Sequence, residues 1–364
     1  MSRRDDIINC LREHDRLTVS QIAEYVYGDR TKGSALRGYF PLMIAEGTIV
    51  ENEDHPVTYS LRNGNIEGQP QQPQAALNRN PSYEGIPIKI NRFYDLIRNY
   101  QEGGPNTRYK SWEWCHKAFL EKKEVYISAN SEDIKEKIVE ELSLHLAFYL
   151  ASWGMYRGSS YLLQRDYKAH KNAVKIILEN RYDLLWDYNP TQENADTATD
   201  LLFNEETGLY KRIKNSYPNY EGSEDNASET LTTKILMGTF GCVPAFDRFL
   251  KKGISNYKNN YPDCGLTQSI ENNGKTYKAL VNFAFNNIGQ LNFDADFYYP
   301  IMKRVDMFFW QTGYELDIAD NLIKRDVSDD KKQSLLAEAI SLGICQEGMS
   351  FQEASDEIKR KNRR

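Results

Sequence analysis

The sequence predicts a mainly α-helical protein, in which a small N-terminal domain of three helices and a β-ribbon is tethered to a larger all-helical domain. Residues 1–65 show helical apolar spacing followed by two short extended stretches. Residues 66–87 are rich in Gln, Pro, Asn and Gly. From residue 88 to about 325, apolar residues recur at intervals of three and four, which is typical of amphipathic helices.

The first two helices are predicted from apolar spacing and from a capping motif. Ile7 and Leu11 recur at helical spacing in the first helix. Thr18 is a preferred N-cap, and Gln21 stands three residues later, where a capping box requires Glu or Gln. The second helix is therefore expected to begin at Val19.

The third helix is expected over residues 33–46 and is followed by a ribbon. Pro41 lies inside this helix and removes a backbone donor, so we expect a kink or a late start. Gly47 ends the helix, and the extended stretches "TIVEN" and "VTYSL" follow it.

With this order of elements, residues 1–65 resemble the winged helix-turn-helix superfamily, above all in "LTVSQIAEYV" and "LRGYFPLMIAEGTIV". The resemblance implies a module that binds duplex DNA with its third helix in the major groove. On that pattern the residues that face DNA are Thr31, Lys32, Ser34 and Arg37. The segment holds eight basic and ten acidic residues, a balance that also fits a winged domain that docks another protein.

Residues 66–87 are predicted to be a flexible linker, because few of them are apolar and the segment cannot bury enough surface to offset the cost of ordering. Within the all-helical domain, residues 88–325, the helix that begins near Glu132 is apolar on nearly every face from Leu142 to Trp153, so we expect it at the centre. Residues 326–364 predict two short amphipathic helices with a basic end.

Charge and cysteine content limit the partners and the compartment. The formal net charge is −6, which predicts no general attraction to nucleic acid or to an anionic membrane, so any DNA contact must come from a local patch. The five cysteines are dispersed without a C-x-x-C pair, and no apolar run reaches the length of a membrane span. We therefore expect a cytoplasmic protein with no membrane partner.

The stretch "GMYRGSSYLLQRDYK" predicts a candidate anion site. Arg157 lies in a glycine-containing loop, and Ser159 or Ser160 would cap the helix expected to follow. Free backbone donors at a helix start, beside an arginine and two hydroxyls, suit a phosphate group. The alternative interpretation is a capped junction without a ligand.

No metal site or cofactor is predicted. The histidines form no H-E-x-x-H motif, and the carboxylates show no metal-ligand spacing. A P-loop and a G-x-S-x-G nucleophile elbow are also missing from the sequence.

The stretch "TTKILMGTFGCVPAFDRFL", residues 232–250, contains the candidate catalytic residue Asp247. One interpretation is that Asp247 is the N-cap of the helix that follows. The stretch also resembles one segment of the helix-hairpin-helix DNA glycosylase superfamily. That resemblance implies that Asp247 stabilises positive charge on the sugar while a flipped-out base stacks on Trp112, Trp114, Trp153 or Trp310.

A similar stretch, "YYPIMKRVDMFFWQTG", places Asp306 on a helix between apolar turns, where we expect it to pair with Arg304 or with a more distant cation.

Three functions remain open from the sequence. The first is a winged-helix DNA-binding protein whose helical domain senses a signal, dimerises or docks a partner. The second is an enzyme of the DNA-glycosylase type that uses Asp247. The third is a protein-interaction module, with a protein partner or a second copy of the chain, that does not bind DNA.

Overall fold

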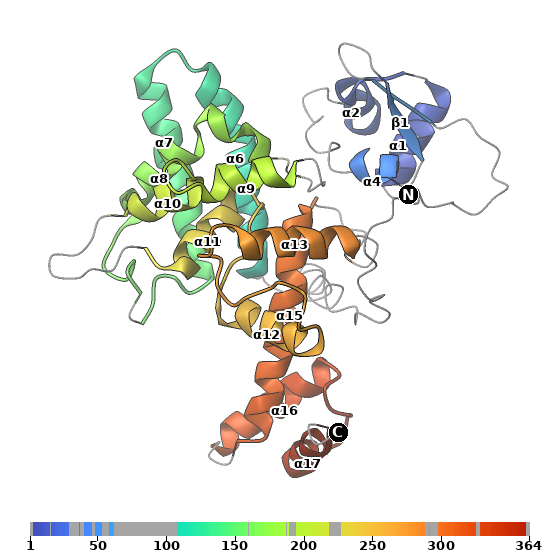
Figure 1. The fold of residues 1–364 in the computed structure, drawn as a ribbon, viewed down its shortest axis with the longest axis vertical. Helices are drawn as coiled ribbons and strands as arrows, with labels where there is room; N and C mark the ends of the chain where they lie inside the picture. Colours follow the sequence, from blue (N-terminus) through green and yellow to red (C-terminus); the bar gives the residue numbers. More distant parts are fainter. Residues whose placement is uncertain are drawn as a thin grey trace. The chain divides into compact units, whose positions relative to one another are not determined.

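The computed structural model describes residues 3–14, 16–28, 36, 40–45, 48–52, 58–61, 108–158, 160–186, 188, 194–217, 227–287, 291, 298–324 and 328–361. Within these residues the protein is mainly α-helical, with one two-stranded antiparallel sheet near the N-terminus. The chain divides into two compact units (Figure 1). Unit 1 comprises residues 1–86 with 293–300, and unit 2 comprises residues 87–292 with 301–364. The predicted linker, residues 66–87, lies outside the described residues.

Unit 1 contains helices and a ribbon. Strand β1 pairs antiparallel with β2, so that Ile49 faces Leu61. Leu17 forms an isolated antiparallel bridge with Tyr59, which gives β2 a partner on its other side. The elements are α1 (Arg3–Glu13), α2 (Val19–Tyr27), α4 (Phe40–Ala45), β1 (Ile49–Asn52) and β2 (Thr58–Leu61).

The capping box predicted at Thr18 is confirmed. The Thr18 backbone N–H donates to Gln21 Oε1 over 2.9 Å, and the Gln21 backbone N–H donates to Thr18 Oγ1 over 3.4 Å. Helix α2 begins at Val19 as expected and ends at Tyr27, and the residue after it, Gly28, is the C-cap with a φ of 68° that favours glycine. The helix described around Pro41, α4, begins at Phe40, so the proline occupies the first turn, where its missing N–H is best tolerated.

One apolar core holds unit 1 together. Residues from each described helix and from the first strand are buried in it, and the ring of Phe40 stacks on Tyr59 at 4.3 Å between centroids. The buried set is Ile7, Cys10, Leu11, Ile22, Ala23, Leu36, Phe40, Met43 and Ile49.

The described elements of unit 2 are all helical. The first two long helices, α6 and α7, lie side by side as a hairpin (Figure 1). The elements are η2 (Arg108–Lys110), α6 (Ser111–Ser128), α7 (Glu132–Ser152), η3 (Tyr167–His170), α8 (Lys171–Ile177), η4 (Asn180–Leu185), α9 (Ala195–Phe203), α10 (Leu209–Asn215), α11 (Glu229–Thr239), α12 (Arg248–Asn260), α13 (Lys275–Asn286), α15 (Ile301–Leu322), α16 (Asp329–Ser341) and α17 (Phe351–Lys361).

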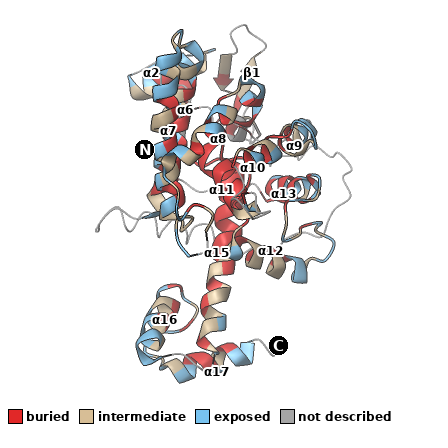
Figure 2. Cartoon of the chain, turned by 90° about the vertical axis from the view of Figure 1, so that its left-hand side faces the viewer, coloured by how far each residue is buried: buried red, intermediate tan, exposed pale blue. Residues whose placement is uncertain are grey.

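The centre of unit 2 is α11 rather than α7, which corrects the sequence-based expectation. Every residue of α11 from Leu231 to Thr239 is buried (Figure 2). Helix α7 buries Leu142 and Leu146, but Leu144 and Phe148 on its other side are exposed. The apolar run of α7 is therefore only partly covered by its neighbours in the described part of the chain.

The two short helices predicted near the C-terminus are α16 and α17, which pack against the second half of α15 around a separate core. All five cysteines are free thiols. None of the described helices is long and apolar enough to cross a membrane.

Candidate functional site

Asp247 stands at the junction between α11 and α12. After α11 the chain turns through Gly241, which has a φ of 69°, and Asp247 then adopts an extended conformation before α12. Its Oδ1 accepts hydrogen bonds from the backbone N–H groups of Phe249 (3.0 Å) and Leu250 (3.1 Å). Asp247 is therefore the N-cap of α12, the first of the two interpretations of this residue.

The second oxygen of Asp247 binds a buried lysine. Lys234 Nζ, from the middle of α11, lies 3.2 Å from Asp247 Oδ2, and both side chains are largely hidden from solvent. Because an unpaired charge is costly in such a place, the two groups stabilise each other in their charged forms.

A second buried ion pair lies beside the same turn. Lys303 Nζ is 2.7 Å from Asp306 Oδ2 on α15, and the two side chains are only 4% and 7% exposed. Asp306 Oδ1 also accepts from the backbone N–H of Ala245 over 2.9 Å, two residues before Asp247. Asp306 thus pairs with Lys303, a cation that the sequence-based expectation did not name, and it fixes the turn that leads to Asp247.

Three of the four tryptophans predicted to stack a base lie around these ion pairs. The Trp153 ring centroid is 5.2 Å from Lys234 Nζ and 5.8 Å from Lys303 Nζ, and the Trp112 ring centroid is 5.4 Å from Lys303 Nζ. Trp310 meets Trp153 edge to face at 5.8 Å. The fourth, Trp114, is 60% exposed and belongs to the outer surface of α6.

Tyr149 is a member of this site that sequence reasoning missed. Burial, with the nearby Asp306, Cys115 and Asp247, raises the pKa of Tyr149 well above its ordinary value, so the phenol stays neutral. Its ring packs directly on α11, because a Cβ added at Gly238 would lie 2.4 Å from Tyr149 Cε1. The only signal for this contact in the sequence was Gly238, a glycine inside a predicted helix, where the missing side chain leaves room for an aromatic ring.

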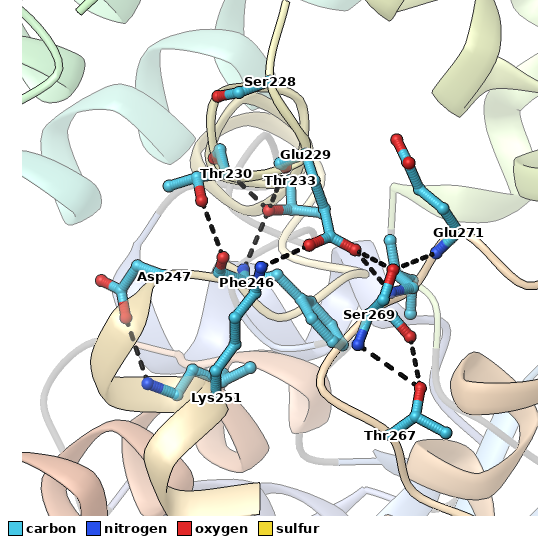
Figure 3. Close-up of polar contacts among 12 residues, drawn as sticks. Ser228, Glu229, Thr230, Thr233, Phe246, Asp247, Lys251, Thr267, Ser269 and Glu271 are labelled. Atoms are coloured by element: carbon cyan, nitrogen blue, oxygen red, sulfur yellow. Dashed lines mark hydrogen bonds and ion pairs between the residues drawn. The ribbon is translucent and has the colours of Figure 1, made fainter. Parts of the chain in front are cut away.

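A polar network around Glu229 holds the turn against α11 (Figure 3). Thr230 Oγ1 donates to the Phe246 carbonyl over 2.8 Å, and the Phe246 N–H donates to Thr233 Oγ1 over 2.9 Å. Both main-chain groups of the residue before Asp247 are therefore bonded to the first turns of α11.

The Glu229 carboxylate extends the network to two more segments (Figure 3). It accepts from Lys251 Nζ on α12 over 2.5 Å, and from Ser269 Oγ and the Ile270 N–H over 2.7 Å each. One carboxylate thus ties α11, α12 and the 267–271 loop together, so the position of Asp247 is set by several elements.

Substitutions at Asp247 are expected to separate its two structural roles. Asp247→Ala removes the cap, which contributes about 1 kcal/mol to the free energy of unfolding. It also leaves Lys234, which is 5% exposed, without its partner, which costs a further ~3 kcal/mol. Asparagine caps as well as aspartate, so Asp247→Asn should lose only the second part. Urea unfolding followed by tryptophan fluorescence measures both variants, and equal losses would contradict the assigned cap.

The predicted anion site differs from its expected local structure. Residues 161–164 form turns, and the next helical element, η3, begins at Tyr167 with Asp166 as its N-cap. Ser160 therefore does not cap a helix. Its hydroxyl donates to the Met155 carbonyl and accepts from the Leu162 N–H over 3.3 Å, because the chain turns back on itself here. Arg157 is exposed, and Ser159 lies outside the described residues.

The four residues predicted to face DNA, Thr31, Lys32, Ser34 and Arg37, also lie outside the described residues. Their role in DNA binding stays a prediction.

Two histidines of unit 2, His116 and His170, are buried, and neither belongs to a recognisable sequence motif. His116 stacks on Trp112, and its Nδ1 lies 2.6 Å from the Thr239 carbonyl oxygen, so this nitrogen carries the proton. His170 bonds through Nε2 to the Tyr156 hydroxyl and through Nδ1 to the Tyr217 hydroxyl, each over 2.7 Å. Burial lowers the pKa of each histidine to about 4.

Because these two histidines are buried in their neutral forms, we expect unit 2 to lose stability in mild acid. Their folded pKa lies below the ordinary value of 6.5, so the unfolded chain binds protons first as the pH falls. The free energy of unfolding is highest above about pH 6.5. It decreases toward pH 4, by up to about 3 kcal/mol per histidine.

Urea unfolding across this pH range measures the effect. The variant His116→Asn retains an N–H donor for Thr239 but does not titrate, so its pH dependence should be shallower. If the free energy of unfolding of His116→Asn depends on pH as steeply as that of the unsubstituted protein, His116 does not contribute to the loss of stability in acid.

The comparisons with known proteins give no relative. No family model matches the sequence, and no significant match was found among the curated proteins or the solved structures. Within the described residues, no group of three or more His, Cys, Asp or Glu side chains could hold a metal ion.

Proposed function

We propose that unit 1 is a winged helix that binds duplex DNA, and that unit 2 is a helical domain that senses a signal, dimerises or docks a partner. The observation that carries the proposal is the bridge between Leu17 and Tyr59. When Leu17 is counted as a short strand beside β2, the described elements follow the order helix, strand, helix, helix, strand, strand. This is the order of elements in a winged helix.

The packing of unit 1 supports a DNA-binding role for the segment before α4. Phe40 and Met43 point into the core, as the apolar face of the helix before a wing should. Lys32 and Arg37 precede them in the sequence, where they could neutralise phosphates or contact guanine.

Salt-dependent binding of the full-length protein to duplex DNA tests the proposal. The logarithm of the association constant should fall with the logarithm of salt concentration by about 0.9 for each phosphate neutralised. The double variant Lys32→Ala/Arg37→Ala should bind more weakly and reduce this slope by up to about 2.

A matched control is Lys117→Ala/Lys332→Ala, which removes the same charge from surface ion pairs of unit 2. It should leave the slope unchanged. A slope near zero for the unsubstituted protein would exclude phosphate contacts and favour the third function, in which unit 1 docks a protein.

A second function, an enzyme that acts on nucleic acid through Asp247, is favoured by one observation. Asp247 pairs with Lys234, and Lys234 lies against the ring of Trp153, one of the tryptophans predicted to stack a base. Duplexes with damaged bases, incubated with the protein and with Asp247→Asn, test this function. Equal base release by the two proteins, or none by either, would contradict it.

A further inference from the structure

Three cations surround one indole ring in unit 2. Arg108 Cζ lies 5.7 Å from the ring centroid of Trp153, in addition to Lys234 Nζ at 5.2 Å and Lys303 Nζ at 5.8 Å. The two lysines are neutralised by Asp247 and Asp306. No carboxylate among the described residues pairs with Arg108, so the cluster retains one net positive charge.

The aromatic rings of this cluster reach the surface where Arg108 does. Arg108 is exposed, and Tyr109 and Trp153 are half-buried. The Arg108 guanidinium lies 5.4 Å from the Tyr109 ring centroid, and Tyr109 meets Trp153 edge to face at 5.7 Å. An arginine placed against two accessible aromatic rings is the combination that proteins use to stack a planar base and to hold its phosphate.

We infer that the surface formed by Arg108, Tyr109 and Trp153 binds a nucleobase joined to a phosphate. The base stacks on the exposed part of the aromatic rings, and the Arg108 guanidinium binds the phosphate. The ligand is either a free mononucleotide or one nucleotide of a single strand. The inference rests on neither proposed function, since it needs no duplex binding by unit 1 and no chemistry at Asp247.

Calorimetric titration of the full-length protein tests the inference with four ligands: AMP, adenosine, inorganic phosphate and a single-stranded oligothymidylate. AMP should bind more tightly than adenosine or phosphate, because only AMP satisfies both halves of the site. Arg108→Ala should weaken AMP binding about tenfold and remove the difference between AMP and adenosine, whereas Arg108→Lys should retain part of it.

The matched control is Arg181→Ala, another exposed arginine of unit 2, which should leave AMP binding unchanged. Tight binding of AMP identifies a free nucleotide as the ligand, and binding of the oligomer alone identifies a single strand. The inference is overturned if neither binds at about 1 mM. It is also overturned if inorganic phosphate binds as well as AMP, or if Arg108→Ala binds like the unsubstituted protein. Arg108 is exposed, so its substitution should not affect folding, which thermal unfolding verifies.

Discussion

Replacing Asp306 with alanine is expected to lower the free energy of unfolding of unit 2 by about 3–5 kcal/mol. The substitution removes the carboxylate that neutralises Lys303, whose side chain is only 4% exposed, and it removes the acceptor of the Ala245 N–H. A buried charge that loses its partner is far more costly than a surface charge. Urea unfolding followed by tryptophan fluorescence measures the loss, because all five tryptophans belong to unit 2.

Asp317→Ala is the matched control on the same helix. Asp317 is 25% exposed and pairs with Lys252 at 3.3 Å and Arg248 at 3.6 Å, both of which reach solvent. Such a pair contributes no more than about 1 kcal/mol. Comparable losses from the two substitutions would show that the pair of Lys303 and Asp306 is not buried as described.

Much of unit 1 could be predicted because its signals are local. A capping box depends on residues three positions apart, so Thr18 and Gln21 fixed the start of α2 without any tertiary information. The two strands followed from short extended stretches that the charged residues Glu53 and Asp54 separate in the sequence. The bridge from Leu17 was missed, because a single residue paired with a distant strand leaves no pattern in the sequence.

The centre of unit 2 could not be predicted from apolar content. Helix α11 carries Thr232, Thr233 and Lys234 in succession and yet is buried from Leu231 to Thr239, whereas α7, with its apolar run from Leu142, exposes Phe148. Threonine hydroxyls can be satisfied inside a helix by its own carbonyls, as the 2.8 Å bond from Thr233 Oγ1 to the Glu229 carbonyl shows. Their polarity therefore does not indicate exposure.

The candidate site shows the same division between local and tertiary information. Asp247 could be predicted as a cap, because its partners lie two and three residues ahead. Its ion pair with Lys234 could not, since 13 residues and a turn separate the two along the chain. The association of Arg108 with Trp153 depends on the packing of η2 against the end of α7, which no local spacing encodes.

The crossing of α12 and α15 depends on two glycines, and it gives the second large prediction. A Cβ added at Gly313 would lie 1.8 Å from the Phe249 carbonyl oxygen, and one added at Gly253 would lie 2.1 Å from the Phe309 carbonyl oxygen. Both obstacles are main-chain atoms, which no side-chain rotation can relieve. The helices would have to move apart and lose the packing between them.

Gly313→Ala is therefore expected to destabilise unit 2 by about 4 kcal/mol or more, at the upper end of what overpacking causes. In a helix without this contact the same change would stabilise the protein by about 1 kcal/mol, so the sign of the effect is diagnostic. Gly348→Ala is the control, because Gly348 has a φ of 85° and nothing within 4 Å of an added Cβ. It should cost only the backbone strain, about 1–2 kcal/mol. A neutral or stabilising result for Gly313→Ala in urea unfolding would mean that α12 and α15 do not approach each other this closely.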